Sequence, residues 1–240
     1  MAGPAEPPAT PPADLSAGAA RYLEAIYYIH HEGEVVRPGR LAEWLGVAAP
    51  SVTEALSRLA RDGLVTTGAG RSVLFTATGH VAAEDVVRRH RIAEVWLFRT
   101  LGFDWVTADA EAHRVAHSLS DTVLARLQES LGNPRTCPHG NAIPGVPQPE
   151  QELIRLVELP RGQPARVARI SEVVEQEAPA LLDVLFRSGI VPGAETSLVG
   201  SAAGTTVELT VGDRPCIRLA TADAANVWVV DPASRPAAPA

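Results

Sequence analysis

The sequence predicts a mainly α-helical chain with a smaller β-rich part: a winged helix-turn-helix, then a helical domain, then a small β-barrel. Three observations predict this class. Two short helical segments joined by a tight turn precede a glycine-tipped hairpin. Two long stretches with helical apolar spacing follow. Beyond residue 150, short β-type runs at close spacing are typical of a small barrel of the SH3-like size.

Composition limits the possible functions. The chain has 240 residues, enough for a few small domains, and a formal charge of −7, which argues mildly against general affinity for nucleic acid. No apolar run is long enough to cross a membrane, and the N-terminus lacks the pattern of a signal peptide. Cys137 and Cys216 are too few for a disulfide scaffold. We therefore expect a cytoplasmic protein with no membrane partner.

The expected domain boundaries follow changes in composition. Proline and alanine dominate both ends of the chain, which predicts disordered tails there. The expected parts are a tail at 1–13, the winged helix-turn-helix at 14–78, the helical domain at 79–140, a linker at 141–150, the barrel at 151–231 and a tail at 232–240.

The winged helix is expected to begin with an amphipathic helix from Ser16 to His31. Two short helices follow, Arg40–Leu45 and Ser51–Arg61, and the turn between them contains Gly46 and Pro50. Proline suits the first turn of a helix, because its missing N–H would have no partner there in any case. This segment therefore has the pattern of a helix-turn-helix.

A hairpin completes the predicted winged helix, with strands at 64–67 and 71–76 around a glycine-rich turn. Residues 37–71 carry five arginines against three acidic residues, a local net charge of +2 within an acidic chain. Helix-turn-helix spacing alone also occurs in helical hairpins of enzymes. The hairpin directly after it favours DNA binding.

The helical domain carries two pairs of metal-capable side chains at helical spacing. His90 and Glu94 form one pair, and His113 and His117 form the other. Residues four apart lie on one face of a helix, so each pair can close on a single ion, with Asp109 nearby as an oxygen donor. Without other support, a surface ion pair or a satisfied core contact is the commoner explanation of such a pair.

Two long helices are expected to carry these pairs. The first runs from Thr78 to about Thr100, and the second from an N-cap at Thr107 to about Leu131. Two long apolar helices beside a DNA-binding unit suit a dimer interface. The buried stripe of the second helix would consist of Val115, Leu119, Val123, Leu124 and Leu127.

The last part begins with a connector, residues 132–149, which is rich in proline and glycine. Cys137 and His139 in this connector resemble half of a zinc knuckle, but no second half is visible, so we interpret the loop as a structural link. One helix, Ala178–Arg187, is expected among the strands. The strands are expected at 153–158, 165–170, 196–199, 205–209, 216–219 and 227–230.

Seven motifs occur in order along the chain: RYLEAIYYIHHEG, LAEWLGVAAPSVTEALSRLARDGLV, RSVLFTATG, RRHRIAEVWL, HSLSD, CPHGNAIPG and SGIVPGAE. Together they resemble the iron-dependent repressor family, typified by the diphtheria toxin repressor, with its manganese-sensing relatives. The resemblance spans residues 15–230. It implies a metal-dependent repressor, with no catalysis, that binds palindromic operator DNA as a homodimer and controls metal-homeostasis genes. It also implies a metal-binding and dimerisation domain and an SH3-like (FeoA-like) domain.

The resemblance implies one metal site between the long helix and the SH3-like domain. Asp109 stands where the family commonly has histidine, and Glu175 stands where it commonly has glutamine. Every position can still ligate, so the site would be intact and rich in oxygen. Its ligands would be His90, Glu94, Asp109, Glu172 and Glu175.

A second implied site departs from the family pattern. Arg21 and Ala116 occupy ligand positions and cannot ligate. His113 and His117 remain, with Glu24 as a candidate replacement ligand. This site is either rebuilt around these three residues or dead.

The implied ligands bear on the metal. A carboxylate-rich set suits Mn(II) or Fe(II), whereas a histidine pair suits Fe(II), Co(II), Ni(II) or Zn(II). Because the soft cysteine and methionine ligands of the family positions are missing, the balance favours manganese or mixed Mn/Fe sensing. The sequence leaves open whether one or two ions bind per subunit.

The resemblance also places residues on DNA. Glu54 stands where the family commonly has glutamine and can accept a hydrogen bond from cytosine N4, so the operator should differ from the family consensus at that base. The expected contacts to base edges and backbone are Pro50, Ser51, Thr53 and Glu54, and those to phosphates are Arg58, Arg61 and Arg71.

Three rival functions come from other classes. A winged-helix regulator that has lost or altered its metal control is the first, because Arg21 and Ala116 degrade one site. A metalloenzyme would need an open coordination site and a general base, and no H-E-x-x-H motif is present. An interaction module built on the SH3-like domain would leave the helix-turn-helix and the ligand pairs unexplained.

Overall fold

The computed structural model describes residues 15–202 and 205–234. The chain divides into two compact units, Met1–His90 and Arg91–Ala240, and each is described by itself. The predicted tail at 1–13 lies outside the described residues, as does most of the tail predicted at 232–240. Residues 232–234 are described and form a turn, in which the Ser234 N–H donates to the carbonyl of Asp231.

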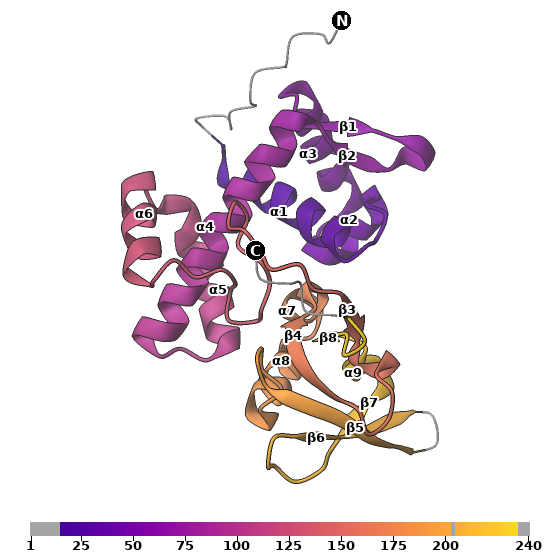
Figure 1. Ribbon diagram of the computed structural model, residues 1–240. Coiled ribbons are helices and arrows are strands. Elements are labelled where there is room, and N and C mark those ends of the chain that lie inside the picture. The colour runs from indigo at the N-terminus through magenta and orange to yellow at the C-terminus, as the bar shows by residue number, and fades with distance from the viewer. Residues whose placement is uncertain (1–14, 203–204, 235–240) are drawn as a thin grey trace, which may run out of the picture. The chain divides into compact units, whose positions relative to one another are not determined.

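The first unit is a winged helix-turn-helix, as the sequence predicts (Figure 1). Ser16 caps its first helix by accepting a hydrogen bond from the Ala19 N–H, and Gly46 ends the second in the left-handed region at φ 63°. Pro50 lies in the first turn of the third helix. The elements are α1 (Ala17–His31), α2 (Pro38–Leu45), α3 (Ala49–Arg61), β1 (Val65–Thr67), β2 (Val73–Phe75) and the start of α4 (Ala77–Leu101).

The core of this unit fixes which face of α3 is exposed. Val52, Ala55 and Leu59 are buried at helical spacing, whereas Leu56 is only half-buried. Strands β1 and β2 pair antiparallel, and the turn between them holds Gly70 and Arg71 in left-handed conformations. The opposite, polar face of α3 therefore remains exposed.

The helical part of the second unit differs from its prediction. Instead of one helix from Thr107 to Leu131 there are two, α5 (Trp105–Val115) and α6 (Asp121–Ser130), with a 3-10 turn between them. Asp104, not Thr107, caps α5, and the hydroxyl of Ser120 starts α6 by accepting from the Val123 N–H. These side-chain oxygens start new helices where apolar spacing alone predicts continuation.

The predicted buried stripe is correspondingly incomplete. Leu124 is fully buried, whereas Val123 keeps 45% of its surface exposed. Val115, Leu119 and Leu127 are half-buried. Because α5 ends before the stripe does, its residues do not share one helix face.

The β-rich part forms one six-stranded sheet in the order β3-β8-β4-β5-β6-β7, and all its pairings are antiparallel (Figure 1). The prediction of a single helix here was wrong, because α7 and α9 accompany α8. Ser171 caps α7, a start signal that the sequence analysis missed. The elements are β3 (Leu153–Arg155), β4 (Pro164–Ile170), α7 (Glu172–Glu177), α8 (Pro179–Ser188), β5 (Glu195–Ala202), β6 (Thr206–Val211), β7 (Ile217–Ala220), α9 (Thr221–Ala224) and β8 (Val227–Val230).

One hydrophobic core joins the helices after residue 90 to the β-rich part. Trp105 from α5 is buried in it and packs on Phe186 of α8 with ring centroids 5.1 Å apart. Phe98 of α4 packs edge-on against the Phe186 ring, with centroids 6.2 Å apart. Buried aromatic pairs of this kind fix relative orientation as well as adding apolar burial, so α4, α5 and α8 form a rigid frame.

Across the described ranges, α4 and every shorter helix lack the sustained hydropathy that a bilayer-crossing helix needs.

Candidate functional site

Four ligand-type side chains converge in the interior of the second unit: Glu94 of α4, Cys137 and His139 of the connector, and Glu175 of α7. Nδ1 of His139 lies 2.8 Å from Oε1 of Glu94 and 3.0 Å from Oε1 of Glu175. Ligand atoms of Glu94, Cys137 and His139 all lie within 4.8 Å of one another. We call these four residues the buried ligand cluster. They supply nitrogen, sulfur and oxygen donors.

The connector holds its two ligands in place through a tight turn. Gly140 adopts φ +89°, and a Cβ at this position would lie 2.1 Å from the carbonyl oxygen of Ala168 on β4. Only glycine allows both the conformation and the close approach. The Ile170 N–H donates to the carbonyl of His139, which ties the turn to the same strand. The sequence Cys137-Pro-His139-Gly140 is thus fixed against the β-rich part.

The cluster is shielded from solvent, and several of its polar atoms lack a hydrogen-bond partner. His139 is 0% exposed, Glu94 1% and Cys137 4%. Within the described parts of the chain, neither carboxylate oxygen of Glu94 and neither ring nitrogen of His139 has a partner in hydrogen-bond geometry, although the ion-pair distances are short. A buried polar group without a hydrogen bond costs roughly 1–3 kcal/mol. Converging buried donors of this kind fit a cation.

Burial and mutual repulsion shift the pKa values of the cluster. Burial, with the nearby charge of Glu94, raises the pKa of the Cys137 thiol to about 12. Burial raises the pKa of Glu175 from its usual 4.5 to about 7 against the attraction of His139, and the charges of Glu94 and Asp109 add to the rise. Burial lowers the pKa of His139, but Glu94 and Glu175 outweigh it and place the pKa well above its usual value. Without an ion, the cluster therefore retains protons near neutral pH.

Two other residues complete the surroundings of His139 and Glu175. The Trp105 ring packs edge-on against the His139 ring, with centroids 4.7 Å apart and planes at 83°. The side-chain amide of Asn141 donates to Oε1 of Glu175 at 3.0 Å. Because the Trp105 indole lies beside a ligand ring, the tryptophan fluorescence of the protein should respond to an ion in the cluster.

The structure brings together only part of the first predicted ligand set. Glu94 and Glu175 meet in the cluster, and Asp109 lies close enough to raise the pKa of Glu175. Glu172 is buried in an ion pair with Arg91, which also donates to the carbonyl of Ala142. Cys137 and His139 were not predicted as members of this group, although their Cys-x-His spacing is visible in the sequence, because the other donors come from distant helices.

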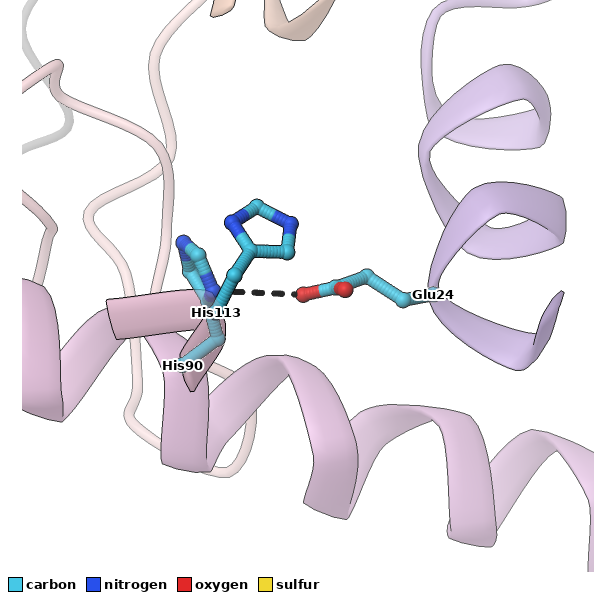
Figure 2. Close-up of side chains that lie close together, drawn as sticks. All are labelled: Glu24, His90 and His113. Atoms are coloured by element: carbon cyan, nitrogen blue, oxygen red, sulfur yellow. Dashed lines mark ion pairs between the residues drawn. The ribbon is translucent and has the colours of Figure 1, made fainter. Parts of the chain in front are cut away.

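His90, the remaining member of that set, is buried in the first unit. Its Nδ1 lies 3.4 Å from Oε1 of Glu24 on α1 (Figure 2). The Tyr28 hydroxyl donates to the same carboxylate oxygen at 3.2 Å. Arg21, one turn before Glu24, donates to the carbonyl of Leu45 at 2.9 Å and so satisfies a carbonyl at the C-terminus of α2. His113, also drawn in Figure 2, belongs to the second unit.

The predicted pair His113 and His117 lies at the end of α5. Nδ1 of His113 is 3.1 Å from the carbonyl oxygen of Asp109, one turn earlier. The α-helix ends at Val115, and His117 is exposed in the following 3-10 turn. Among the described residues, no group of three or more candidate ligands includes His117.

The exposed face of α3 and the hairpin tip carry the residues predicted to contact DNA. Glu54 and Arg58 form a loose ion pair at 3.7 Å, with 73% and 59% of their side chains exposed. The hydroxyl of Thr53 donates to the carbonyl of Ala49. All seven predicted contacts are exposed: Pro50, Ser51, Thr53, Glu54, Arg58, Arg61 and Arg71.

Comparison with known proteins covers almost the whole described chain. Residues 14–73 match the model of "Iron dependent repressor, N-terminal DNA binding domain", and residues 76–145 match "Iron dependent repressor, metal binding and dimerisation domain". Residues 154–231 match the FeoA domain.

Individual relatives agree with these matches. The chain is 35% identical over 210 residues to the iron-dependent repressor IdeR of Mycobacterium leprae, covering 83% of this chain and 91% of the relative. It is 32% identical over 197 residues to the diphtheria toxin repressor of Corynebacterium diphtheriae, covering 78% and 86%. Among solved structures, a manganese-dependent transcriptional repressor in complex with manganese superposes with a TM-score of 0.77 at 31% identity, covering 88% of this chain and 99% of the other.

Proposed function

This chain belongs to the iron-dependent repressor family, and we propose that its buried ligand cluster holds the divalent cation on which repression depends. The chain is a metal-dependent transcriptional repressor with DNA-binding, dimerisation and FeoA domains, and not an enzyme. The observation that carries the proposal is the convergence of Glu94, Cys137, His139 and Glu175 in the interior of the second unit.

The residues of the cluster fit this role through their proton chemistry. A bound divalent cation supplies two positive charges, the largest local charge in such a site. Glu175 and His139 retain protons without an ion, and both give them up when they ligate. Cys137 ligates as a thiolate and gives up its proton too. Occupancy and proton release are therefore coupled.

The origin of the ligands links the cluster to the fold. Glu94 comes from α4, His139 from the connector and Glu175 from α7, so coordination ties three separate elements of the second unit together. Without a cation, the carboxylates of Glu94 and Glu175 repel each other, and His139 attracts both. We propose that a fully ligated cluster shifts the population of the dimer toward its operator-binding form.

The donor set bears on the metal. The sequence-based argument for manganese assumed that no soft ligand remained, but Cys137 lies within the cluster. A thiolate with an imidazole and carboxylates ranks Fe(II) above Mn(II), and it also accepts Co(II) and Zn(II). We propose Fe(II), or mixed Fe/Mn, as the corepressor. The IdeR relatives and the manganese-bound structural relative support both metals.

DNA is read by α3 in this proposal. The side chains of Ser51, Thr53 and Glu54 would meet base edges, with Pro50 in apolar contact, and Arg58, Arg61 and Arg71 would meet phosphates. A homodimer would read the two halves of a palindromic operator about 34 Å apart. A protein with this role acts in the cytoplasm, where the operator is.

The other sequence-derived ligands remain predictions. His90, Asp109 and Glu172 belong to the first implied set, and Glu24, His113 and His117 belong to the second. A stoichiometry of two ions per subunit would require ligands beyond the four in the cluster.

The test is operator binding by the chelated protein, with Mn(II), Fe(II), Co(II), Ni(II) or Zn(II) added back singly in a gel-shift assay. We expect metal-dependent binding that His139→Ala abolishes. His80→Ala is the matched control, because His80 is an exposed histidine paired with Glu84 on α4. Equal operator binding with and without metal would instead favour the alternative function, a winged-helix regulator that has lost metal control.

A further inference from the structure

We infer that Arg169 is a positioning residue for the buried ligand cluster: it fixes the side-chain amide of Asn141, which in turn holds the carboxylate of Glu175. The inference deepens the proposed metal-binding role and rests on it. Neither Arg169 nor Asn141 is a ligand itself. Both lie outside the ligand sets that the sequence implies.

Asn141 makes three polar contacts through one buried amide. It is 1% exposed. Its Nδ2 donates to the carbonyl of Ile170 at 3.1 Å and to Oε1 of Glu175 at 3.0 Å. Its Oδ1 accepts from Nη1 of Arg169 at 3.3 Å. If the amide were reversed, its oxygen would face the two acceptor oxygens of Ile170 and Glu175, and its N–H groups would face the Arg169 guanidinium. These neighbours therefore select a single orientation.

The strand geometry explains why Arg169 reaches this amide. The pairing of β4 with β8 shifts register between Val167 and Arg169, and Arg169 lies directly opposite Trp228. Such irregularities redirect side chains. The Arg169 guanidinium lies 4.7 Å from the centre of the Trp228 ring, and only 9% of the residue is exposed. A stacked, buried guanidinium is held in one place, so the hydrogen bond to Asn141 is preorganised.

A second arginine on the same ring provides an internal control. Arg155 lies 4.5 Å from the centre of the Trp228 ring and donates to the carbonyl of Ala225 at 2.6 Å. Both arginines therefore stack on one tryptophan. Arg169 donates to Asn141, whereas the hydrogen bond of Arg155 goes to Ala225. Loss of either removes a cation–π contact, whereas loss of Arg169 also frees the amide.

The geometry at Glu175 defines what the amide does. Oε1 of Glu175 accepts a hydrogen bond from the Asn141 amide at 3.0 Å and lies 3.0 Å from Nδ1 of His139. These two contacts fix the rotation of the carboxylate relative to the imidazole. Hydrogen-bond partners that orient ligands typically change metal affinity by about 10- to 100-fold when removed.

The charge of Arg169 acts in the opposite direction, which makes the inference testable. A buried cation near the cluster repels a divalent ion, so removing it through charge alone would tighten metal binding. Removing a positioning residue weakens metal binding. The sign of the change separates the two roles.

The experiment is a titration of the chelated, full-length protein with Co(II), followed by the absorption of the bound ion. We expect Arg169→Gln to weaken Co(II) binding by about tenfold or more, Arg169→Lys to recover part of the loss, and Arg155→Gln to stay close to wild type. Thermal unfolding of the metal-free variants checks that the two Gln variants remain folded to the same extent.

A double-variant cycle isolates the route through Asn141. Asn141→Ala should weaken binding as much as Arg169→Gln, and the double variant should lose no more than Asn141→Ala alone. Unchanged or tighter binding in Arg169→Gln, equal losses in both arginine variants, or additive losses in the double variant would each overturn the inference. If wild type itself binds no Co(II), or His139→Ala titrates like wild type, the proposed function fails as well.

Discussion

The buried ligand cluster and the His113/His117 pair are two groups of metal-capable residues in the same unit, and they differ in almost every physical respect. The cluster joins α4, the connector and α7, and its residues are nearly inaccessible. The pair is local in sequence, but α5 ends between its members and both rings are exposed. Spacing of four residues describes a shared face only while the α-helix continues. Tertiary contacts, rather than spacing, assembled the better donor set.

The energetic difference follows from solvation. The carboxylate oxygens of Glu94 and the ring nitrogens of His139 are buried and have no hydrogen-bond partner among the described residues, so the metal-free state carries a desolvation cost that coordination would relieve. His113 and His117 are exposed to solvent and carry no comparable cost. We therefore expect metal binding, stability and proton uptake to be coupled in the cluster and uncoupled in the pair.

The largest expected effect is on affinity. His139→Ala should weaken binding of Fe(II) or Co(II) by about 100-fold or more, because it removes the one ring on which Glu94 and Glu175 both converge. His117→Ala should change the affinity by less than about twofold. Calorimetric titration measures both constants. If the His117 variant lost as much affinity as the His139 variant, the two groups would form one functional unit and the contrast would not hold.

The next effect is on pH dependence. The folded pKa of Glu175 lies at about 7, above its usual 4.5, so this group stabilises the metal-free fold below about 4.5 and loses that contribution as the pH rises through about 7. The raised pKa of His139 acts in the same direction. Metal binding must displace these protons and that of Cys137, so affinity should rise by about 100-fold or more per pH unit between roughly pH 6 and 7, since at least two protons leave.

Proton release measured by calorimetry in buffers of different ionisation enthalpy tests this pH dependence. The metal-induced rise in Tm should also increase over the same interval, because the metal-free protein loses stability as its affinity for metal grows. A Tm increment independent of pH would show that the cluster is already deprotonated without metal.

A smaller effect concerns selectivity. Cys137→Ser replaces a soft donor by a hard one at a fully buried position. We expect the affinity for Co(II) or Zn(II) to fall by about tenfold relative to that for Mn(II). Cys216→Ser is the matched control, because Cys216 is exposed. Parallel competition titrations with the three ions measure the ratio. An unchanged ratio would remove the thiol from the ligand set.

The smallest expected effect concerns an exposed residue, because exposed side chains can be functional where they contact DNA. Glu54→Gln adds a donor to an exposed side chain of α3 and should change the preferred base at one operator position by about 1–3 kcal/mol. Selection of bound sequences from a randomised operator measures the preference. An unchanged preference would show that Glu54 does not reach a base edge.

The sequence by itself determined the winged helix-turn-helix, the order of the domains and the family. Each of these depends on local signals: the serine cap before Ala17, the left-handed Gly46, the proline in the first turn of α3, and alternation in the strands. A local signal also gave one wrong prediction. The apolar spacing continues past Ser120 and predicts one helix, although the Ser120 hydroxyl caps the start of a new one.

Only the tertiary structure decided which donors meet. Cys137 and His139 were visible in the sequence as half of a site, and the other half came from α4 and α7. Glu172 was an equally plausible ligand by spacing, but Arg91 engages it in a buried ion pair. The physical reason is that coordination depends on distances of a few ångströms between side chains far apart in the chain. Those distances are set by the shared core around Trp105, to which no local pattern refers.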